Sequence, residues 1–299
     1  MERRKYLIKP KATIGVCVRN GENLIKDAIN SIMRQDFHNE LIEVIFVDDG
    51  SKDKTLSIIK SYVPKMDMQV KVFHQEWKGL GPTRNVVVNN AEGKYIIWVD
   101  CDMRLPRDFV RKQVEFMDRN PRVGIGKGRY GTYNTISLVA YLENIEAVVK
   151  FLDIDHKVLS KPLGTGGSIY RVKALREVGE FDENIKEAGE DIDAEHRIKE
   201  AGWLLSVTPA EFYEIRRKNW KALWNEYFWH GFGGRLVFQR NKLRSILYMM
   251  FPPFAILTVF SRSCDAYRLV HRKVVFLLPF HWIFKRTAWF IGFATAYVK

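Results

Sequence analysis

Short runs of β-branched and aromatic residues alternate with amphipathic stretches over the first two hundred residues, and this alternation limits the fold more than any other feature. It favours an α/β fold, in which helices flank a mostly parallel central sheet. The predicted strands are Ala12–Val18, Ile42–Asp48, Gln69–His74 and Lys94–Asp100. The predicted helices are Asn23–Gln35, Ser51–Tyr62 with Ser51 as its cap, Pro82–Ala91, Pro106–Arg119 and Ser137–Leu152.

Positive charge is concentrated at the C-terminal end. The net charge is +13, and residues 211–299 contain 15 Lys and Arg against 4 Asp and Glu, together with 22 of the 39 aromatic residues. Residues 1–210 are nearly balanced in charge. We therefore expect one domain over residues 1–210 and a basic, aromatic, helical region over residues 211–299.

The C-terminal region contains three apolar runs, Ile246–Phe260, Val274–Phe284 and Ala288–Val298. Each is shorter than the roughly 20 residues of a spanning helix, and joining the last two would place Lys285 and Arg286 near the middle of a bilayer. Aromatic helices with basic edges favour a position in the plane of an anionic membrane surface. A re-entrant hairpin, a true span and an oligomer interface remain alternatives. The basic edge residues are Arg235, Arg240, Lys242, Arg244, Arg262, Arg268, Arg272, Lys273, Lys285 and Arg286.

The three cysteines, Cys17, Cys101 and Cys264, lie far apart and lack the spacing of metal ligands. We therefore expect neither a disulfide nor a structural zinc site, as in a reducing compartment. The first six residues are basic but are not followed by the apolar stretch of a secretory signal. This favours a main domain that stays in the cytosol.

Two carboxylates, Asp100 and Asp102, stand at the end of the fourth predicted strand. Because alternate residues of an extended chain point the same way, both side chains can approach one hard divalent cation. A plain turn is the alternative, since Asp is common in turns.

Other strand ends also bear polar groups. Asp48 and Asp49 precede Gly50, and carboxylates there can accept hydrogen bonds from a base or a ribose, with helix capping as the alternative. The segment 79–85 contains a glycine-rich turn, and Arg84 lies in the first turn of the predicted helix that follows. Such an arrangement is suitable for contact with a diphosphate or a base. Neither GxxxxGK[ST] nor GxGxxG is present there, which argues against P-loop hydrolases and dinucleotide enzymes.

A third polar cluster consists of the segment 164–168, rich in glycine, and the acidic pair Glu190 and Asp191. Acidic residues are favoured in the first turn of a helix, so capping accounts for the pair. A general base is the alternative, because an aspartate about 3 Å from an acceptor hydroxyl could remove its proton.

Taken together and in order, six segments resemble the family 2 inverting glycosyltransferases of GT-A fold, over roughly residues 10–235. The resemblance implies a Rossmann-like, mostly parallel sheet flanked by helices, followed here by a C-terminal amphipathic and aromatic helical extension. It also divides the first domain into a nucleotide-sugar half, about 1–102, and an acceptor half, about 103–210. The segments are VCVRNGENL at 16–24, VDDGS at 47–51, GLGPTRN at 79–85, VDCD at 99–102, GGS at 166–168 and GEDID at 189–193.

By this resemblance Asp191 is the general base. The nucleotide sugar would be bound by Val18, Asn20, Glu22, Asp48, Asp49, Arg84 and Asp100. The cofactor, Mg²⁺ or Mn²⁺, would be bound by Asp102, Asp100 and Glu214. The sugar and acceptor would be bound by Gly166, Gly167, Glu190 and Trp220.

The sequence departs from the family pattern in three places. Residues 17–20 read CVRN where a proline, an aromatic residue and an asparagine are usual, and Glu214 stands where many relatives have a metal-binding histidine. Glutamate is an acceptable oxygen ligand for either cation. The segment from Arg216 to Trp220 only partly matches the QxxRW element of processive synthases, which favours transfer of a single sugar.

The resemblance implies an enzyme of glycan biosynthesis that moves one sugar, with inversion, from a UDP- or GDP-linked donor to a hydroxyl or phosphate. A glycan or polyprenyl-linked acceptor, an anionic membrane surface and a location at the cytoplasmic face, peripheral or monotopic, are expected, and nucleic acid is not. One rival is a sugar-nucleotide pyrophosphorylase, which would need a basic glycine-rich loop where this chain has RNGE at 19–22. The other is a non-catalytic basic module that binds membrane or nucleic acid.

Overall fold

The computed structural model describes residues 8–151, 163–241 and 252–298. The chain forms two compact units, and neither is continuous in sequence. The first consists of Met1–Arg129, His156–Lys186 and Asp191–Tyr213, and the second of Tyr130–Asp155, Glu187–Glu190 and Glu214–Lys299. The predicted division into a domain over residues 1–210 and a helical region over residues 211–299 stays a prediction.

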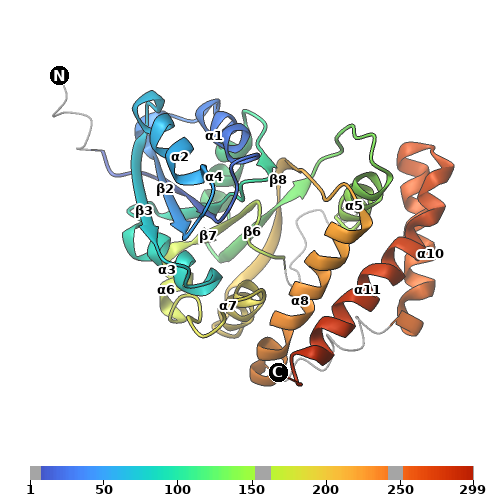
Figure 1. Cartoon of the computed structure of the whole chain (residues 1–299). Helices are drawn as coiled ribbons and strands as arrows, with labels where there is room; N and C mark the ends of the chain where they lie inside the picture. The colour runs from blue at the N-terminus through green and yellow to red at the C-terminus, as the bar shows by residue number, and fades with distance from the viewer. Residues whose placement is uncertain (1–7, 152–162, 242–251, 299) are drawn as a thin grey trace. The chain divides into compact units, whose positions relative to one another are not determined.

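The first unit is built on a sheet, which has eight strands within the described residues (Figure 1). The strand order is β3-β2-β1-β4-β7-β6-β8-β5. Strands β1, β2, β3 and β4 are parallel, whereas β7 is antiparallel to both β4 and β6. The strands are β1 Ala12–Val18, β2 Ile42–Asp49, β3 Gln69–Gln75, β4 Tyr95–Trp98, β5 Met103–Arg104, β6 Val123–Tyr130, β7 Ser168–Arg171 and β8 Leu204–Glu214.

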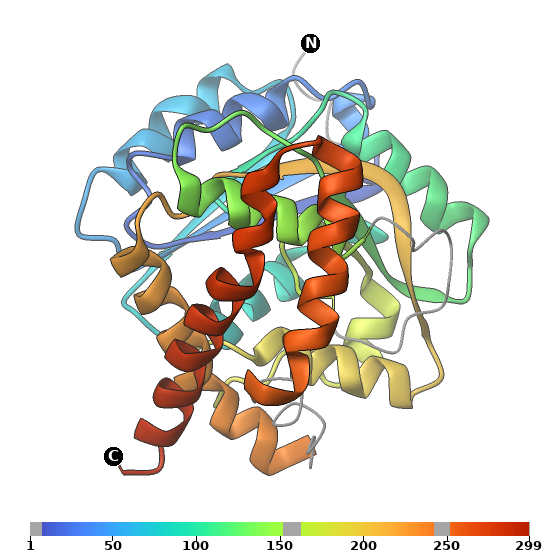
Figure 2. The ribbon, with the colours of Figure 1, turned by 90° about the vertical axis from the view of Figure 1, so that its right-hand side faces the viewer.

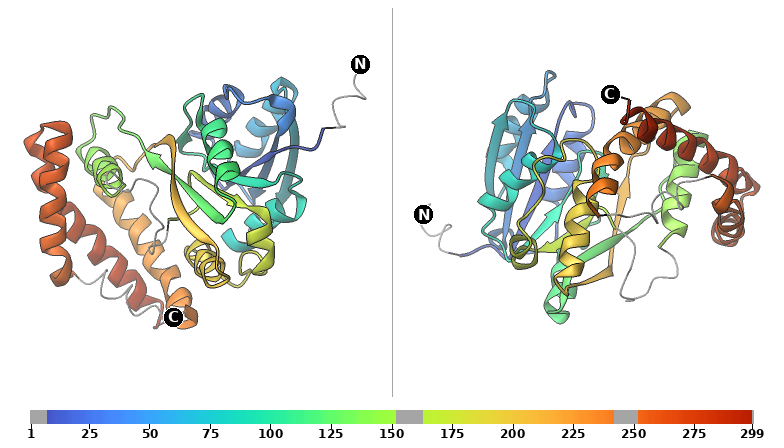
Figure 3. Two further views of the ribbon diagram at one scale, coloured as in Figure 1. Left: turned by 180° about the vertical axis from the view of Figure 1, so that it is seen from behind. Right: turned by 90° about the horizontal axis from the view of Figure 1, so that it is seen from below.

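Helices cover both faces of this sheet. Because crossovers between parallel strands are right-handed, the step from β1 to β2 to β3 places α1 and α2 on one face, and the return to β4 places α3 on the other (Figure 3). The mostly parallel α/β sheet predicted from the sequence is therefore confirmed. The helices are α1 Ile25–Met33, α2 Thr55–Tyr62, α3 Leu80–Asn90, α4 Phe109–Arg119, α6 Val172–Glu177 and α7 Glu190–Glu200, with short 3-10 helices at Asn39–Leu41 and Val63–Lys65.

Two predicted element ends are wrong for local reasons. Ser51 does not cap α2, which begins at Thr55; the Ser51 hydroxyl instead accepts a hydrogen bond from the Asn20 N–H at 2.9 Å. Strand β4 ends at Trp98 rather than at Asp100, because the Met103 N–H donates to the Asp100 carbonyl at 3.0 Å and closes a turn.

The second unit is helical in its described part. Its core combines Leu142, Ile145, Ala266, Val275 and Trp282 with further buried side chains. Figure 2 shows α10 and α11 side by side, joined by the segment that contains η4. The helices are α5 Leu138–Val149, α8 Trp220–Asn241, α10 Pro252–Val270, the 3-10 helix η4 Lys273–Leu277 and α11 Leu278–Thr295.

Glycines allow α8 and α11 to cross at very short range. A Cβ added to Gly231 would overlap the carbonyl of Trp289, and one added to Gly292 would overlap the carbonyl of Phe228. Ala288 is also fully buried. Small residues thus let two aromatic-rich helices approach backbone to backbone.

The expectation of separate short apolar helices is wrong for the last two runs, since α11 passes continuously through residues 278–295. Lys285 does not interrupt the helix, because it is only 2% exposed and is paired with carboxylates of α5. By length and composition Lys273–Thr295 could cross a membrane. Of its apolar 18-residue stretch, 39% is buried within the protein. The run Ile246–Phe260, with Lys242 and Arg244, lies partly outside the described residues.

Candidate functional site

Neighbouring strand ends bring the first predicted residues together. Val18, the last residue of β1, is paired in register with Asp48 of β2. Beyond Val18, Asn20 adopts φ 52°, and its side-chain oxygen accepts the Lys52 N–H at 2.9 Å. Glu22 accepts the Lys54 N–H at 2.9 Å. Asn20 and Glu22 therefore connect the loop after β1 to the loop after β2.

Asp48 and Asp49, adjacent in sequence, differ in what they contact. Asp49 accepts the backbone N–H groups of Lys78 at 2.8 Å and Gly79 at 3.0 Å, so its carboxylate holds the turn before α3. Asp48 is fully buried, and its Oδ2 contacts His74 Nδ1 at 2.7 Å. No described residue hydrogen-bonds to its Oδ1. Asp48 thus retains an acceptor that a ligand could use.

Arg84 is on α3 and is buried at 5% exposure. Its guanidinium carbon lies 5.3 Å from the centre of the Trp98 ring and 5.8 Å from that of Phe181. Cations over aromatic faces are stabilised by the ring quadrupole. The structure therefore places a positive charge beneath the end of β4, where the acidic turn begins.

The two carboxylates after β4 lie on a turn. Asp100, Cys101 and Asp102 are half-buried, and the Asp100 N–H donates to the sulfur of Met103 at 3.3 Å. The prediction of an extended chain through Asp100 and Asp102 is therefore wrong. Asp100 and Asp102 still lie on one tight turn, separated only by Cys101.

The segment 164–167 lies against this turn. A Cβ added to Gly166 would lie 2.7 Å from Asp100 Oδ2, so only glycine leaves room for that carboxylate. Gly167 adopts φ 71° and donates its N–H to the Trp98 carbonyl at 3.0 Å. A Cβ on Gly167 would also overlap the ring of Phe212. Both predicted glycines are thus required by close contacts.

Asp191 lies at the other end of the same segment. It is the second residue of α7, and its Oδ2 accepts the Thr165 N–H at 3.3 Å. Its Oδ1 accepts the Ile192 N–H at 2.8 Å. A Cβ on Gly164 would lie 3.6 Å from Asp191 Oδ2. The structure therefore places Asp100 beside Gly166, and Asp191 beside Gly164 and Thr165, of the same segment.

Two buried charges that the sequence analysis missed hold this segment. Glu195 accepts the N–H groups of Leu163 at 2.6 Å and Gly164 at 2.7 Å. Lys127 of β6 donates to the carbonyls of Gly164, at 3.5 Å, and Gly166. Glu195 follows Asp191 by four residues, a spacing that places both on one helix face and could have revealed it.

The ionisation of Glu195 depends on this environment. Burial and the negative charge of Asp191 raise the pKa of Glu195 to about 7, against the opposing effect of its two backbone hydrogen bonds and of Lys127. Tyr170 donates its hydroxyl to Glu195 at 3.3 Å, and burial together with the charges of Glu195 and Asp191 raises the pKa of Tyr170.

Three predicted residues belong to the second unit. Glu190 is 1% exposed, and its carboxylate accepts the Gly189 N–H at 3.1 Å, as expected at a helix start. Glu214 lies 2.5 Å from Arg216 Nη1, so its carboxylate has a cationic partner. Trp220 begins α8 at 41% exposure and packs edge to face on Phe284 at 4.9 Å. Their predicted ligands stay predictions.

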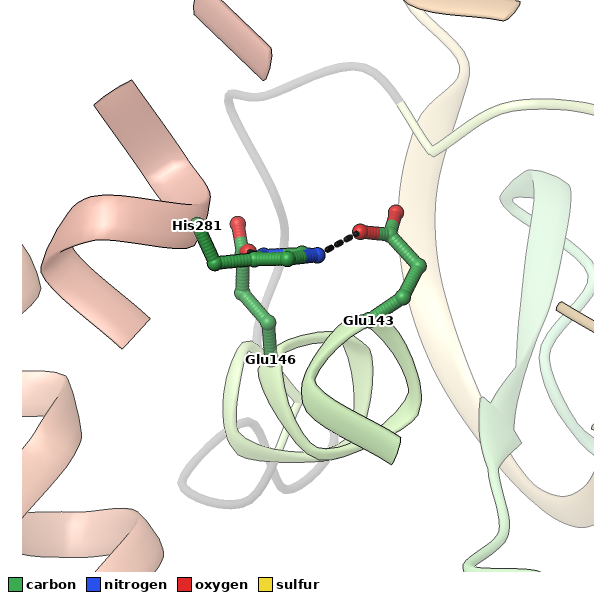
Figure 4. A group of neighbouring side chains, drawn as sticks. All are labelled: Glu143, Glu146 and His281. Carbon is green, nitrogen blue, oxygen red and sulfur yellow. Dashed lines mark ion pairs between the residues drawn. The ribbon is translucent and has the colours of Figure 1, made fainter. Parts of the chain in front are cut away.

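The second unit also contains a group with metal-ligand chemistry that the sequence analysis did not anticipate. Glu143, Glu146 and His281 bring carboxylate and imidazole atoms within 4.8 Å of one another (Figure 4). Lys285 Nζ lies 2.7 Å from Glu143 and 2.6 Å from Glu146. The lysine ammonium is thus the cation of this group, which we interpret as a buried ion-pair network.

The network is further connected by Tyr227, whose hydroxyl donates to Glu143 at 2.7 Å. Burial raises the pKa of Glu146, but the charge of Lys285 and the contact with His281 outweigh it and lower the pKa below its ordinary value. The pKa of Glu143 is lowered in the same way, chiefly by Lys285.

Known proteins share both sequence and fold with this chain. The family described as "Glycosyl transferase family 2" matches residues 13–179, just over half of the chain. Poly(ribitol-phosphate) beta-N-acetylglucosaminyltransferase TarS of Staphylococcus aureus (strain Mu50) is 33% identical over 110 residues, which are 37% of this chain and 19% of TarS. Glycosyltransferase GlyA of Streptococcus pneumoniae is 26% identical over 246 residues, 75% of this chain and 33% of GlyA. The chain thus matches only a fifth to a third of these relatives.

Solved structures share the fold at low sequence identity. The mannosyltransferase PcManGT of Pyrobaculum calidifontis, in complex with GDP-Man and Mn²⁺, has a TM-score of 0.69 at 17% identity, covering 97% of this chain and 88% of that chain. Residues 1–349 of TarS from Staphylococcus aureus, in complex with UDP, have a TM-score of 0.53 at 19% identity, covering 96% and 91%.

Proposed function

Because this chain belongs to glycosyl transferase family 2, we propose that it transfers one sugar from a UDP- or GDP-linked donor to an acceptor, with inversion at the anomeric carbon. The observation that supports this most directly is the placement of Asp100 and Asp191 against two ends of the segment 164–166. A donor needs groups for its nucleotide and diphosphate, and an acceptor needs a base. In our proposal Asp100 serves the diphosphate and Asp191 serves the acceptor, each from its own end of the segment 164–166.

The proposed nucleotide contacts are at the ends of β1 and β2. The unused Oδ1 of buried Asp48 can accept a hydrogen bond from a base N–H or a ribose hydroxyl. Arg84, buried among aromatic rings, supplies a positive charge for the diphosphate. Asn20, Glu22 and Asp49 act on this site indirectly in our proposal, since each holds a loop of the protein.

The residues after β4 fit a divalent cation. Asp100 and Asp102 offer hard oxygen ligands on one half-buried turn, and Gly166 leaves the space that a Cβ would fill beside Asp100. When bound, Mg²⁺ or Mn²⁺ would neutralise the charge that grows on the diphosphate as the sugar leaves. Glu214 stays a predicted ligand from the family resemblance, and its carboxylate is paired with Arg216.

Asp191 is proposed to accept the proton of an acceptor hydroxyl. The N–H groups of Thr165 and Ile192 donate hydrogen bonds that orient this carboxylate. A carboxylate in its ionised form can accept a proton. Gly166 and Gly167 are proposed to line the sugar and acceptor region, and the same role for Glu190 and Trp220 stays a prediction from the family resemblance. A phosphate acceptor would already be ionised at pH 7 and would need no base.

The proposed acceptor is a lipid-linked glycan or a polyprenyl-linked sugar at the cytoplasmic face of a membrane, with the protein peripheral or monotopic. The basic and aromatic residues of the second unit support this choice, because lysine and arginine can contact lipid phosphates. No observation favours a pyrophosphorylase or a nucleic-acid-binding protein.

Thermal melting with a panel of UDP- and GDP-sugars, with and without Mn²⁺, tests the donor assignment. We expect one donor to raise Tm only when the cation is present, and Asp102→Ala to remove this dependence. Asp118→Ala, on the far end of α4, is the matched control and should keep it. A panel in which no donor changes Tm would contradict the proposal.

A further inference from the structure

The turn between α10 and α11, residues 268–280, presents apolar side chains to solvent. Leu269, Phe276 and Leu277 are each about 40% exposed, and Phe280 is 70% exposed. Monomeric proteins rarely leave several large apolar side chains exposed within one short stretch, and such patches mark sites of association.

The same turn is positively charged throughout. Arg268, Arg272 and Lys273 are exposed, and residues 268–280 include no Asp or Glu. Asp265, one turn earlier, pairs with Arg268 at 3.3 Å, but this pair is exposed and therefore weak. Apolar and cationic groups are thus interleaved without a compensating acidic group in the turn.

The apolar side chains of the turn cannot fold inward. Val275 and Leu278 already fill the inner side, at 0% and 1% exposure, where they pack in the core with Trp282. His271 adopts φ 50° and donates its N–H to the Tyr267 carbonyl at 2.8 Å, which ends α10 firmly. The outward residues are therefore presented by a fixed backbone.

We propose that the α10–α11 turn inserts Leu269, Phe276, Leu277 and Phe280 into the headgroup region of an anionic bilayer, with Arg268, Arg272 and Lys273 against lipid phosphates. Apolar groups flanked by cations match the boundary between acyl chains and anionic headgroups. A second copy of the chain is a poorer partner, because a symmetric contact through this turn would place cations against cations. This inference and the proposed function are linked only through the lipid-linked acceptor, because binding to a bilayer does not itself require sugar transfer.

Sedimentation with vesicles tests the proposal without any sugar donor, so its failure leaves the transfer reaction untouched. We expect binding to vesicles of 70% phosphatidylcholine and 30% phosphatidylglycerol, and at least tenfold weaker binding to phosphatidylcholine alone. The double variant Phe276→Asn/Phe280→Asn should lose at least tenfold in affinity at both low and high salt. Ile136→Asn, which changes a fully exposed apolar residue outside the turn, is its control.

The charge contribution is tested separately. Arg272→Gln/Lys273→Gln should weaken binding about 25-fold at low salt, since each cation near an anionic surface contributes about fivefold, and the loss should shrink as salt rises. Arg119→Gln/Lys199→Gln, which removes two exposed cations of the first unit, should bind like the unchanged protein.

The assignment to this turn would be overturned if Arg119→Gln/Lys199→Gln lost as much binding as Arg272→Gln/Lys273→Gln. Full binding by Phe276→Asn/Phe280→Asn with its Tm unchanged would overturn it as well. Absence of vesicle binding, with a dimer in light scattering that Phe276→Asn/Phe280→Asn dissociates, would assign the surface to a second copy instead.

Discussion

The carboxylate of Asp100 lies so close to the Cα of Gly166 that a Cβ there would be 2.7 Å from Oδ2. This contact joins the acidic turn after β4 to the segment that Asp191 holds from its other end. The position of the Asp100 carboxylate is therefore sensitive to a single methyl group at residue 166.

Gly166→Ala should lower turnover about 100-fold while the protein remains folded, because the new methyl group displaces the Asp100 carboxylate and misplacement by about 1 Å costs that much. Steady-state kinetics and a melting curve measure both. The control is a double-mutant cycle with Asp100→Asn, in which the two losses should not add. Full additivity would show that the contact with Asp100 is not the cause.

Asp191→Asn distinguishes the two acceptor chemistries. With a hydroxyl acceptor we expect a loss of about 10²–10⁴-fold in kcat, whereas a phosphate acceptor should leave much of the activity. Nucleotide release with each acceptor type measures the difference. Asp27→Asn, at an exposed site on α1, should change neither rate.

Glu195 should make stability depend on pH. Its pKa is raised to about 7 from an ordinary 4.5, so the stabilisation of the protonated form is complete below pH 4.5 and is lost as pH rises through 7. The loss corresponds to roughly 3 kcal/mol. Urea unfolding of Glu195→Gln and of the unchanged protein at several pH values isolates this contribution. A difference between them that does not vary with pH would contradict it, and Glu115→Gln serves as the exposed control.

Lys285→Met should lower the free energy of unfolding by about 3–5 kcal/mol, because it leaves Glu143 and Glu146 buried without their ammonium partner. Restoring neutrality with Glu143→Gln/Glu146→Gln in the same chain should recover much of the loss. If Lys285→Met were as stable as the unchanged protein, the network would not be a buried ion pair. Because the pKa of Glu146 is lowered, its stabilisation is present above pH 4.5 and is lost in acid.

The parallel strands β1 to β4 were predictable because each is a short apolar or β-branched run followed by a turn signal, whereas β5, β6, β7 and β8 were not predicted. Strand β1 has the predicted bounds, and α7 begins at Glu190, the first residue of the acidic pair. Ser51 could not be assigned correctly, since its hydroxyl contacts Asn20, 31 residues away, rather than its own helix.

The site was harder to predict than the sheet. Motifs indicated Asp100, Asp191 and the glycines, and the helical spacing from Asp191 could have pointed to Glu195. Nothing local showed that Gly166 would contact Asp100 or that Lys127 would hold the segment between the two aspartates. Lys285 illustrates the same limit, because a charge within an apolar run has no visible partner until helices distant in sequence pack together.

The partners of Lys285 precede it in the chain by 142 and 139 residues. At synthesis rates of about 5–20 residues per second, α5 leaves the ribosome roughly 7–28 s before α11 exists. During that interval Glu143 and Glu146 have to remain hydrated, and the second unit cannot complete its interior. A nascent chain arrested between the two helices should therefore expose α5 to protease long after the parallel strands of the first unit have become resistant.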